Sequence, residues 1–307
     1  MTELLRSYPF SAPADVLAQV RLAHDLPRCA PDSATESDRR AAMLADSLRS
    51  GLLARVQLDL GDPRAAIAQA DAALRLAVRA RSVEAVARLR SLQSEAAHWA
   101  HWPHEALRYA RLGVDAGATG TGFAMIKFVE ARSHALLGDD NEAREALRAA
   151  NKAVATAEPD ALDAIGGHLG ITEARRQYLE AEACVHIRDG ARRAGECAIA
   201  AVRLFAVADP FTEKPDAGAR IAPEAAAATA ILALAYAREG YLDGVRATLD
   251  DLLPLETARR TAPVTLSAAR IHAELRRPQW IRSRGVREMQ EQIEGFCQVV
   301  AGSEASG

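Results

Sequence analysis

The sequence predicts an all-α fold, a right-handed α-solenoid of paired helices. Two observations support this prediction. Composition is 49% hydrophobic but only 5% aromatic, and many of the apolar residues are alanine, which favours helices and lets them pack closely. In addition, a turn residue recurs five times along the chain in the same context. Self-similarity at such a period predicts an array of helical hairpins, each too thin to bury its apolar face without a neighbour.

The repeat is defined by a turn residue with small or apolar residues at fixed distances from it. The turn residues are Gly61, His101, Gly138, Gly190 and Gly240. A small residue stands seven places before each turn: Ala54, Ser94, Ala131, Ala183 and Ala233. Small or apolar residues stand five, nine and twelve places after each turn; in the fourth copy these are Gly195, Ile199 and Val202. Two antiparallel helices need small residues where they approach closely and apolar residues at i, i+4 and i+7.

The predicted elements follow this repeat. Residues 1–37 form a proline-punctuated leader with a short helix over 14–24. The first hairpin spans 38–60 and 63–80, with Pro63 in the first turn of its second helix, where proline is tolerated. The second and third hairpins span 82–116 and 121–157.

The later part of the chain has a longer period. The turns are first 40 and 37 residues apart and then 52 and 50. The extra length falls in residues 158–171 and 209–223, which are predicted as loops that can fold over the concave face of the array. A final pair of helices, over 262–276 and 283–300, is expected to cap a repeat domain of residues 38–300. The tail, 301–307, is predicted to be disordered.

Charge and hydropathy exclude several classes of partner. The formal net charge of −3 and the pI near 6.3 do not provide the basic surface that specific nucleic-acid binding requires. No window reaches the ~20 apolar residues of a membrane helix, and no export signal is visible, so we expect a cytoplasmic protein without a membrane partner. The four cysteines show no CxxC spacing and are expected to be free thiols. No cofactor-binding loop is visible, and no cofactor is expected.

Several stretches resemble a known family. The pattern Leu60-Gly61-Asp62 followed by regularly spaced alanines, repeated after Leu137-Gly138-Asp139, resembles the tetratricopeptide repeat. Residues 58–77, 130–150 and 166–183 look like the C-terminal sensing domain of actinobacterial helix-turn-helix (XRE-type) regulators. The DNA-binding helices that precede the repeats in those regulators are not found in this sequence. The resemblance therefore implies ligand or peptide binding, in a regulatory or adaptor role.

The candidate binding site lies on the first helix of each hairpin, which lines the concave face in such arrays. One stripe of positions on these helices collects charged, polar and apolar residues. The predicted ligand-binding residues are Arg55, Arg88, Glu95, His98, Phe128, Arg132, Gln177 and Glu180. The arginines could hold a carboxylate or phosphate through two parallel hydrogen bonds, with Met125 and Phe128 as apolar contacts. In the alternative interpretation, Arg55, Glu95 and Arg132 form an ion ladder between repeats and have no ligand.

The histidines are interpreted structurally. His98, His101 and His104 lie near Glu105, but their spacing of three residues crosses a turn and matches no metal-binding motif, so no metal site is expected. His134 and His186 both fall four places before a turn and are expected to pack within their hairpins.

Three functions remain open from the sequence. The first is a binding module for a peptide, a protein or a small polar or anionic ligand. The second is an enzyme of specialised metabolism built on the repeat scaffold, with a constellation such as Glu95, His98 and Arg132; no nucleophile–base pair is visible to support it. The third is assembly, in which the concave face binds a helix from a partner or from a second copy in a homodimer.

Overall fold

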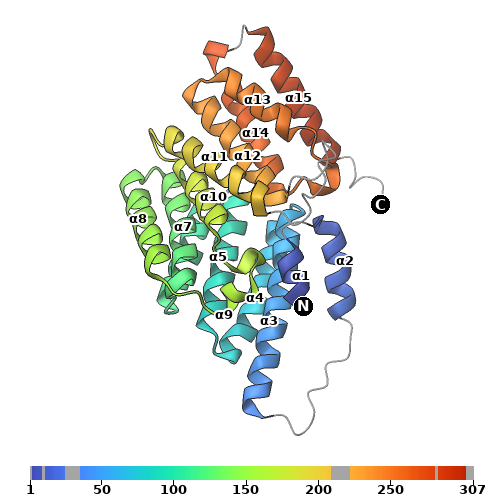
Figure 1. Cartoon of the computed structure of the whole chain (residues 1–307), viewed down its shortest axis with the longest axis vertical. Helices are drawn as coiled ribbons and strands as arrows, with labels where there is room; N and C mark the ends of the chain where they lie inside the picture. The colour runs from blue at the N-terminus through green and yellow to red at the C-terminus, as the bar shows by residue number, and fades with distance from the viewer. Residues whose placement is uncertain (1, 9–10, 25–34, 209–221, 281–282, 302–307) are drawn as a thin grey trace. The chain divides into compact units, whose positions relative to one another are not determined.

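The chain is all-helical in the computed structural model, as predicted (Figure 1). The structure describes residues 2–8, 11–24, 35–208, 222–280 and 283–301, and within these ranges it contains fifteen α-helices, several short 3-10 helices and no strand. In the same ranges, no helix combines the length and the hydropathy needed to cross a membrane.

The chain divides into two compact units, Met1–Ile171 and Thr172–Gly307. The first unit contains nine α-helices and the 3-10 helix η2 among its described residues. These are α1 (Thr2–Ser7), α2 (Pro13–His24), α3 (Glu36–Asp59), α4 (Pro63–Ala80), α5 (Val83–Trp99), α6 (Pro103–Asp115), α7 (Gly120–Leu137), α8 (Asp140–Thr156), α9 (Ala161–Ile165) and η2 (Gly167–Leu169).

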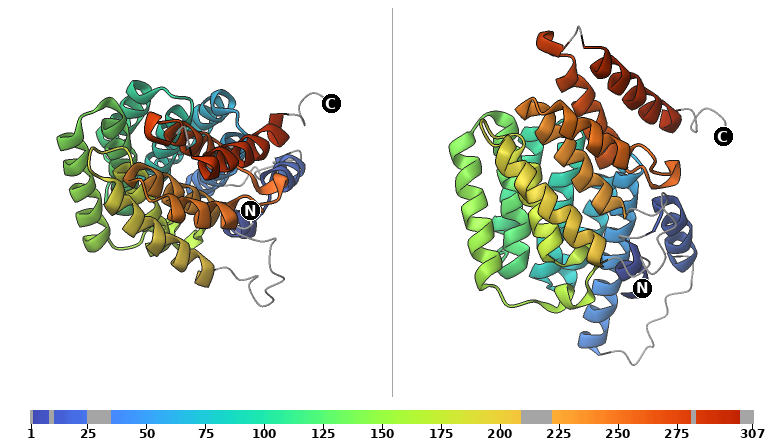
Figure 2. Two further views of the ribbon diagram at one scale, coloured as in Figure 1. Left: turned by 90° about the horizontal axis from the view of Figure 1, so that it is seen from above. Right: turned by 45° about the horizontal axis from the view of Figure 1, so that its top comes forward.

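Hairpins organise the first unit. The pairs α3–α4, α5–α6 and α7–α8 pack along their lengths, and α7 and α8 run side by side in all views (Figures 1 and 2). The second helix of each pair also packs on the first helix of the next pair. In addition, the first helices contact one another, α3 with α5 and α5 with α7. Their shared face is therefore formed by side chains from successive hairpins.

The second unit repeats this pattern. Its elements are α10 (Glu173–Cys184), α11 (Ala191–Ala208), α12 (Pro223–Glu239), α13 (Leu242–Leu252), η3 (Thr257–Arg259), α14 (Ala262–Leu275), η4 (Pro278–Trp280) and α15 (Arg284–Ala301). Successive helices pack from α10 to α13, α12 also contacts α10 and α14, and α15 packs on α14 and α13.

Local capping explains where several helices begin. Thr35 and Asp38 form a reciprocal capping box at the start of α3. The Asp62 carboxylate accepts a hydrogen bond from the backbone N–H of Ala65, and Pro63 occupies the first turn of α4, where its missing N–H is not needed. These residues stop one helix and start the next within three positions, which makes the first hairpin tight.

The predicted repeat register is confirmed for the contact between the paired helices. Gly61, Gly138 and Gly240 adopt φ of +91°, +84° and +79°, the left-handed region that glycine enters without strain, and His101 adopts φ +60°. The residues seven places before the turns have no exposed surface: Ala54, Ser94, Ala131, Ala183 and Ala233.

The fourth hairpin departs from the predicted register by one residue. The left-handed residue is Asp189 (φ +58°), and not Gly190. Gly190 is needed for another reason, because a Cβ there would overlap the carbonyl oxygen of Cys184. Ile199 and Val202 are consequently half-buried. The positions of α11 without exposed surface are instead Ala194, Ala198 and Ala201, each one residue before a predicted position.

Two further expectations need correction. Residues 158–171, predicted as a loop, contain α9 and η2, and the N-terminal helix α1 was not expected. Helix α9 has only five residues, and a capping box between Asp160 and Asp163 stabilises its start. The predicted loop at 209–223 falls largely on residues 209–221, which lie outside the described residues, as do residues 302–307 of the predicted tail.

Candidate functional site

The first helices of the unit 1–171 carry buried ionisable side chains on successive hairpins. Glu95 and His98 lie one turn apart on α5, and Arg132 lies on α7; their exposed fractions are 8%, 1% and 1%. Arg55 lies on α3 with a side chain that is 11% exposed. The predicted candidates of this unit are thus buried, and the burial of a charged group requires compensating partners.

Arg55 and Glu95 form an ion pair between two hairpins. The Nη1 of Arg55 lies 2.7 Å from Oε1 of Glu95, which joins α3 to α5. This contact is the one that the ion-ladder interpretation predicts between the first and second repeats. A ligand contact by the same side chains stays a prediction.

Asp59 and Tyr8 complete this group, which we call the Arg55 cluster (Tyr8, Arg55, Asp59 and Glu95). Asp59 accepts two hydrogen bonds from Nε and Nη2 of Arg55, both 3.1 Å long, and a third from the Tyr8 hydroxyl. Neither residue was among the predicted candidates. Asp59 could have been found from the sequence, because it follows Arg55 by four positions on one helix and such positions lie side by side. Tyr8 could not have been found in this way, because its partner is 51 residues away in the chain.

Burial dominates the electrostatics of the Arg55 cluster. It raises the pKa of Asp59, although Arg55 and the Tyr8 hydrogen bond act in the opposite direction. Burial, together with the charge of Asp59, raises the pKa of Tyr8 well above its usual value, so the phenol stays protonated and remains a donor. The carboxylates and the guanidinium of the cluster thus serve as one another's hydrogen-bond partners in a buried environment.

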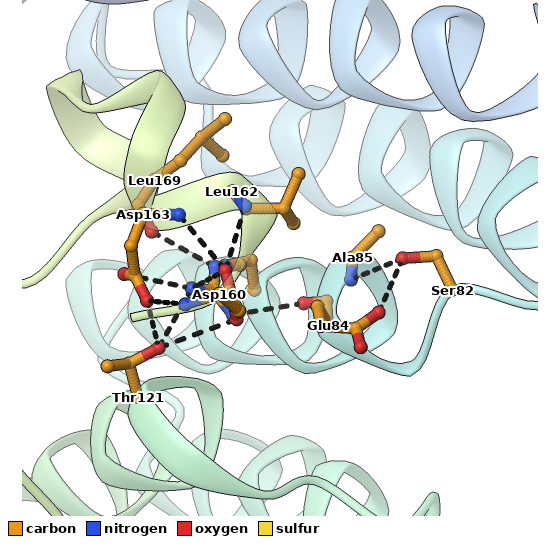
Figure 3. A network of polar contacts seen from close by, with 9 residues as sticks. Ser82, Glu84, Ala85, Thr121, Asp160, Leu162, Asp163 and Leu169 are labelled. Carbon is orange, nitrogen blue, oxygen red and sulfur yellow. Dashed lines mark hydrogen bonds and ion pairs between the residues drawn. The ribbon is translucent and has the colours of Figure 1, made fainter. Parts of the chain in front are cut away.

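Arg88, another predicted ligand contact, is the centre of an internal network. Figure 3 shows its partners Thr121, Asp160, Asp163 and Leu169. Its Nε donates to the carbonyl oxygen of Leu169 at 3.0 Å, and its Nη2 donates to the Thr121 hydroxyl at 3.0 Å. The guanidinium also pairs with Asp160 at 2.8 Å and with Asp163 at 3.1 Å. Arg88 thereby fastens the α9–η2 segment to α5 and α7. Any ligand of Arg88 would compete with these internal acceptors.

Apolar side chains lie on the same helices. Phe128 and Met125 on α7 are 1% and 3% exposed, and the His98 ring packs edge-on against Trp99 with centroids 4.6 Å apart. The two residues expected to supply apolar contact are thus part of the core.

The unit 172–307 contains the other two predicted residues. Glu180 on α10 accepts hydrogen bonds from Arg176 at 2.9 Å and from Arg193 of α11 at 2.7 and 2.9 Å. Gln177 donates to Glu173 at 2.9 Å. Because Arg176 lies on α10 and Arg193 on α11, Glu180 links the two helices of the fourth hairpin. Burial raises the pKa of the neighbouring Cys197 thiol to about 12, and the charge of Glu180 adds to this shift.

The histidines occupy separate environments. His98 is buried, whereas His101, His104 and Glu105 are exposed at and after the turn. The described part of the chain holds no group of three His, Cys, Asp or Glu side chains suited to a metal ion. His134 packs in its hairpin as predicted, with Nδ1 3.3 Å from an Asp139 oxygen.

The interactions at the Arg55 cluster are charge-assisted hydrogen bonds between side chains of this chain. Glu95 and His98 share one face of α5, but the contacts described above are ion pairs and hydrogen bonds without a nucleophile positioned by a base. No protein-family model matches this chain, and no curated protein matches it either.

Proposed function

We propose that the chain is a binding module for a peptide or a small polar or anionic ligand, with a regulatory or adaptor role. The single observation that carries this proposal is the burial of charged side chains at equivalent positions on successive first helices, Arg55, Glu95 and Arg132. Buried ion pairs add little net stability compared with apolar residues of the same size. Their repeated use on one face is therefore better suited to recognition than to stabilisation.

The proposal includes a tetratricopeptide-like arrangement within each unit. Small residues without exposed surface lie between the paired helices, and first helices contact first helices, α3 with α5 and α5 with α7. In the second unit α10 contacts α12, and α12 contacts α14. These contacts support a stack of hairpins whose first helices share one face, which is the arrangement expected of a right-handed solenoid.

Binding is tested on variants of the charged residues. A thermal-shift screen of short peptides, carboxylates and phosphate esters identifies a ligand, and calorimetric titration then compares wild type with Arg55→Ala and Arg132→Ala. Loss of one charged contact should weaken binding by ~1.5–3 kcal/mol. Arg40→Ala is the matched control, because Arg40 is exposed and paired with Glu36 on its own helix.

The competing ion-ladder interpretation predicts a different result. If the arginines only stabilise the scaffold, both variants should melt at lower temperature while the affinity for the ligand holds. That outcome would reject the proposed site. A lower affinity with a well-folded variant would support it.

A further inference from the structure

Two hairpin turns place an aromatic residue where the following helix would normally be capped. Trp102 and Tyr241 are the N-cap residues of α6 and α13, and in both the backbone N–H donates at 2.9 Å to the carbonyl oxygen five places earlier. Neither side chain caps its helix, whereas Asp62, at the same place in the first hairpin, caps α4. The two rings are 36% and 54% exposed, so neither is needed for the core.

The Trp102 ring already holds a cation. The Cζ of Arg64, from the second helix of the preceding hairpin, lies 5.6 Å from the ring centroid, and Arg64 forms no ion pair with a described residue. A guanidinium over an aromatic face is a favourable contact. In the hairpin before Tyr241, the arginines at the corresponding place, Arg192 and Arg193, pair with glutamates of their own hairpin. Within the described residues, no cation lies over the Tyr241 ring.

The position of the Tyr241 ring is fixed by its neighbours. It packs against Tyr236 with the ring planes at 90° and the centroids 5.2 Å apart. A Cβ at Gly244 would overlap both tyrosine rings, so the first turn of α13 requires glycine here although glycine disfavours a helix. A ring that is held in place and still half exposed is preorganised for contact with a partner.

The charges beside this ring are negative. Glu239 ends α12 and Asp243 lies in the first turn of α13; both are exposed, and neither forms an ion pair with a described residue. The arginine of each helix, Arg238 and Arg246, is paired with a glutamate of α14 or α15. The surface around Tyr241 is therefore complementary to a cation.

We propose that Tyr241, with Tyr236, Glu239 and Asp243, forms a docking surface for an arginine side chain of a basic partner peptide. The guanidinium lies over the exposed tyrosine ring, as Arg64 lies over a tryptophan ring in the second hairpin, and the two carboxylates pair with it. Arginine is preferred to lysine, because the planar guanidinium stacks on a ring and is less strongly hydrated. The inference goes beyond the proposed function and does not depend on the Arg55 cluster.

The test uses a fluorescein-labelled Gly-Arg-Gly-Arg-Gly peptide, amidated at its C-terminus and titrated into the full chain at low ionic strength while anisotropy is followed. Tyr241→Ser removes the ring and supplies a capping hydroxyl, so the variant should stay folded and bind at least threefold more weakly. Tyr241→Phe keeps the ring and should bind within twofold of wild type. Trp102→Ser is the matched control, because its ring is already taken by Arg64, and it should bind like wild type.

The carboxylates and the peptide provide independent comparisons. Glu239→Gln/Asp243→Asn leaves the rings unchanged and should also weaken binding at least threefold, with a smaller dependence on salt. A lysine peptide should bind more weakly than the arginine peptide, and a citrulline peptide, which is planar but neutral, more weakly still. Wild-type affinity in Tyr241→Ser, an equal loss in Trp102→Ser, or equal binding of the arginine and citrulline peptides would overturn the inference.

Discussion

Charged side chains inside the unit 1–171 are buried as groups of opposite sign. Asp59 and Glu95 share the Arg55 guanidinium, and Asp160 and Asp163 share that of Arg88. A single carboxylate transferred from water without such a partner costs several kcal/mol. Substituting one member of either group therefore changes the energy of its neighbours as well.

Only part of this pairing can be predicted from the sequence. The Arg55–Glu95 contact follows from the repeat, because equivalent positions on successive first helices lie close together. Asp59 follows from its i, i+4 spacing to Arg55. The Tyr8 contact does not, since it depends on how a short N-terminal helix folds back over α3, which no local pattern determines.

Cysteine reactivity provides a test at this scale. Cys197 is 1% exposed, and its pKa is raised to about 12, so at pH 8 only about one thiol in ten thousand is ionised. We expect iodoacetamide to leave Cys197 unmodified in the folded protein and to modify it after denaturation, as read by peptide mass spectrometry. Rapid alkylation in the folded state would show that α10 and α11 do not enclose this thiol.

At the scale of the element, the register of each hairpin depends on alanines that leave no room for a larger side chain. Ala131 of α7 and Ala143 of α8 have no exposed surface. The register was predictable because close helix packing requires small residues at fixed distances from a turn. The one-residue shift in the fourth hairpin was not, since Asp189 in place of glycine adopts the left-handed conformation.

Enlarging these alanines should destabilise the third hairpin. Ala131→Leu and Ala143→Leu each force the two helices apart, which should lower the free energy of unfolding by ~1–3 kcal/mol in urea titrations. Ala155→Leu, at an exposed position of α8, is the control and should change stability little. Unchanged stability of both buried variants would mean that the assigned register is wrong.

The α9–η2 segment shows why a loop prediction failed. Its helix has five residues and no apolar periodicity to detect, and it is held by the capping box and by Arg88, which is 81 positions from its acceptor Leu169. Tertiary contacts of this kind are not encoded in a local pattern.

Removing Arg88 should therefore be costly. Arg88→Ala leaves Asp163 buried without its cation, and we expect a loss of ~3–5 kcal/mol in the free energy of unfolding. Arg40→Ala removes an exposed i, i+4 pair and should cost less than about 0.5 kcal/mol. If Arg88→Ala were as stable as the control, the network of Figure 3 would not fasten the segment, and Arg88 would be available to a ligand.

At the scale of the whole molecule, the described helices contact mainly their neighbours in sequence. In the unit 172–307, α10 packs on α11 and α12, whereas α15 packs on α13 and α14. Stability in such an array is approximately a sum of local terms and nearest-neighbour interfaces. The two ends of the unit should then respond separately to a local change.

A substitution that creates a cavity at the C-terminal end of this unit tests whether the two ends respond separately. Phe296 on α15 is 4% exposed, and the Arg260 guanidinium lies over its ring, 4.1 Å from the centroid. Phe296→Ala removes this contact and should cost up to ~3–5 kcal/mol locally. Hydrogen exchange should then accelerate in α13, α14 and α15, while α10 and α11 keep their protection; Gln292→Ala, exposed on the same helix, should change neither. A uniform loss of protection from α10 to α15 would show that the unit unfolds as one cooperative block, and the nearest-neighbour description would not hold.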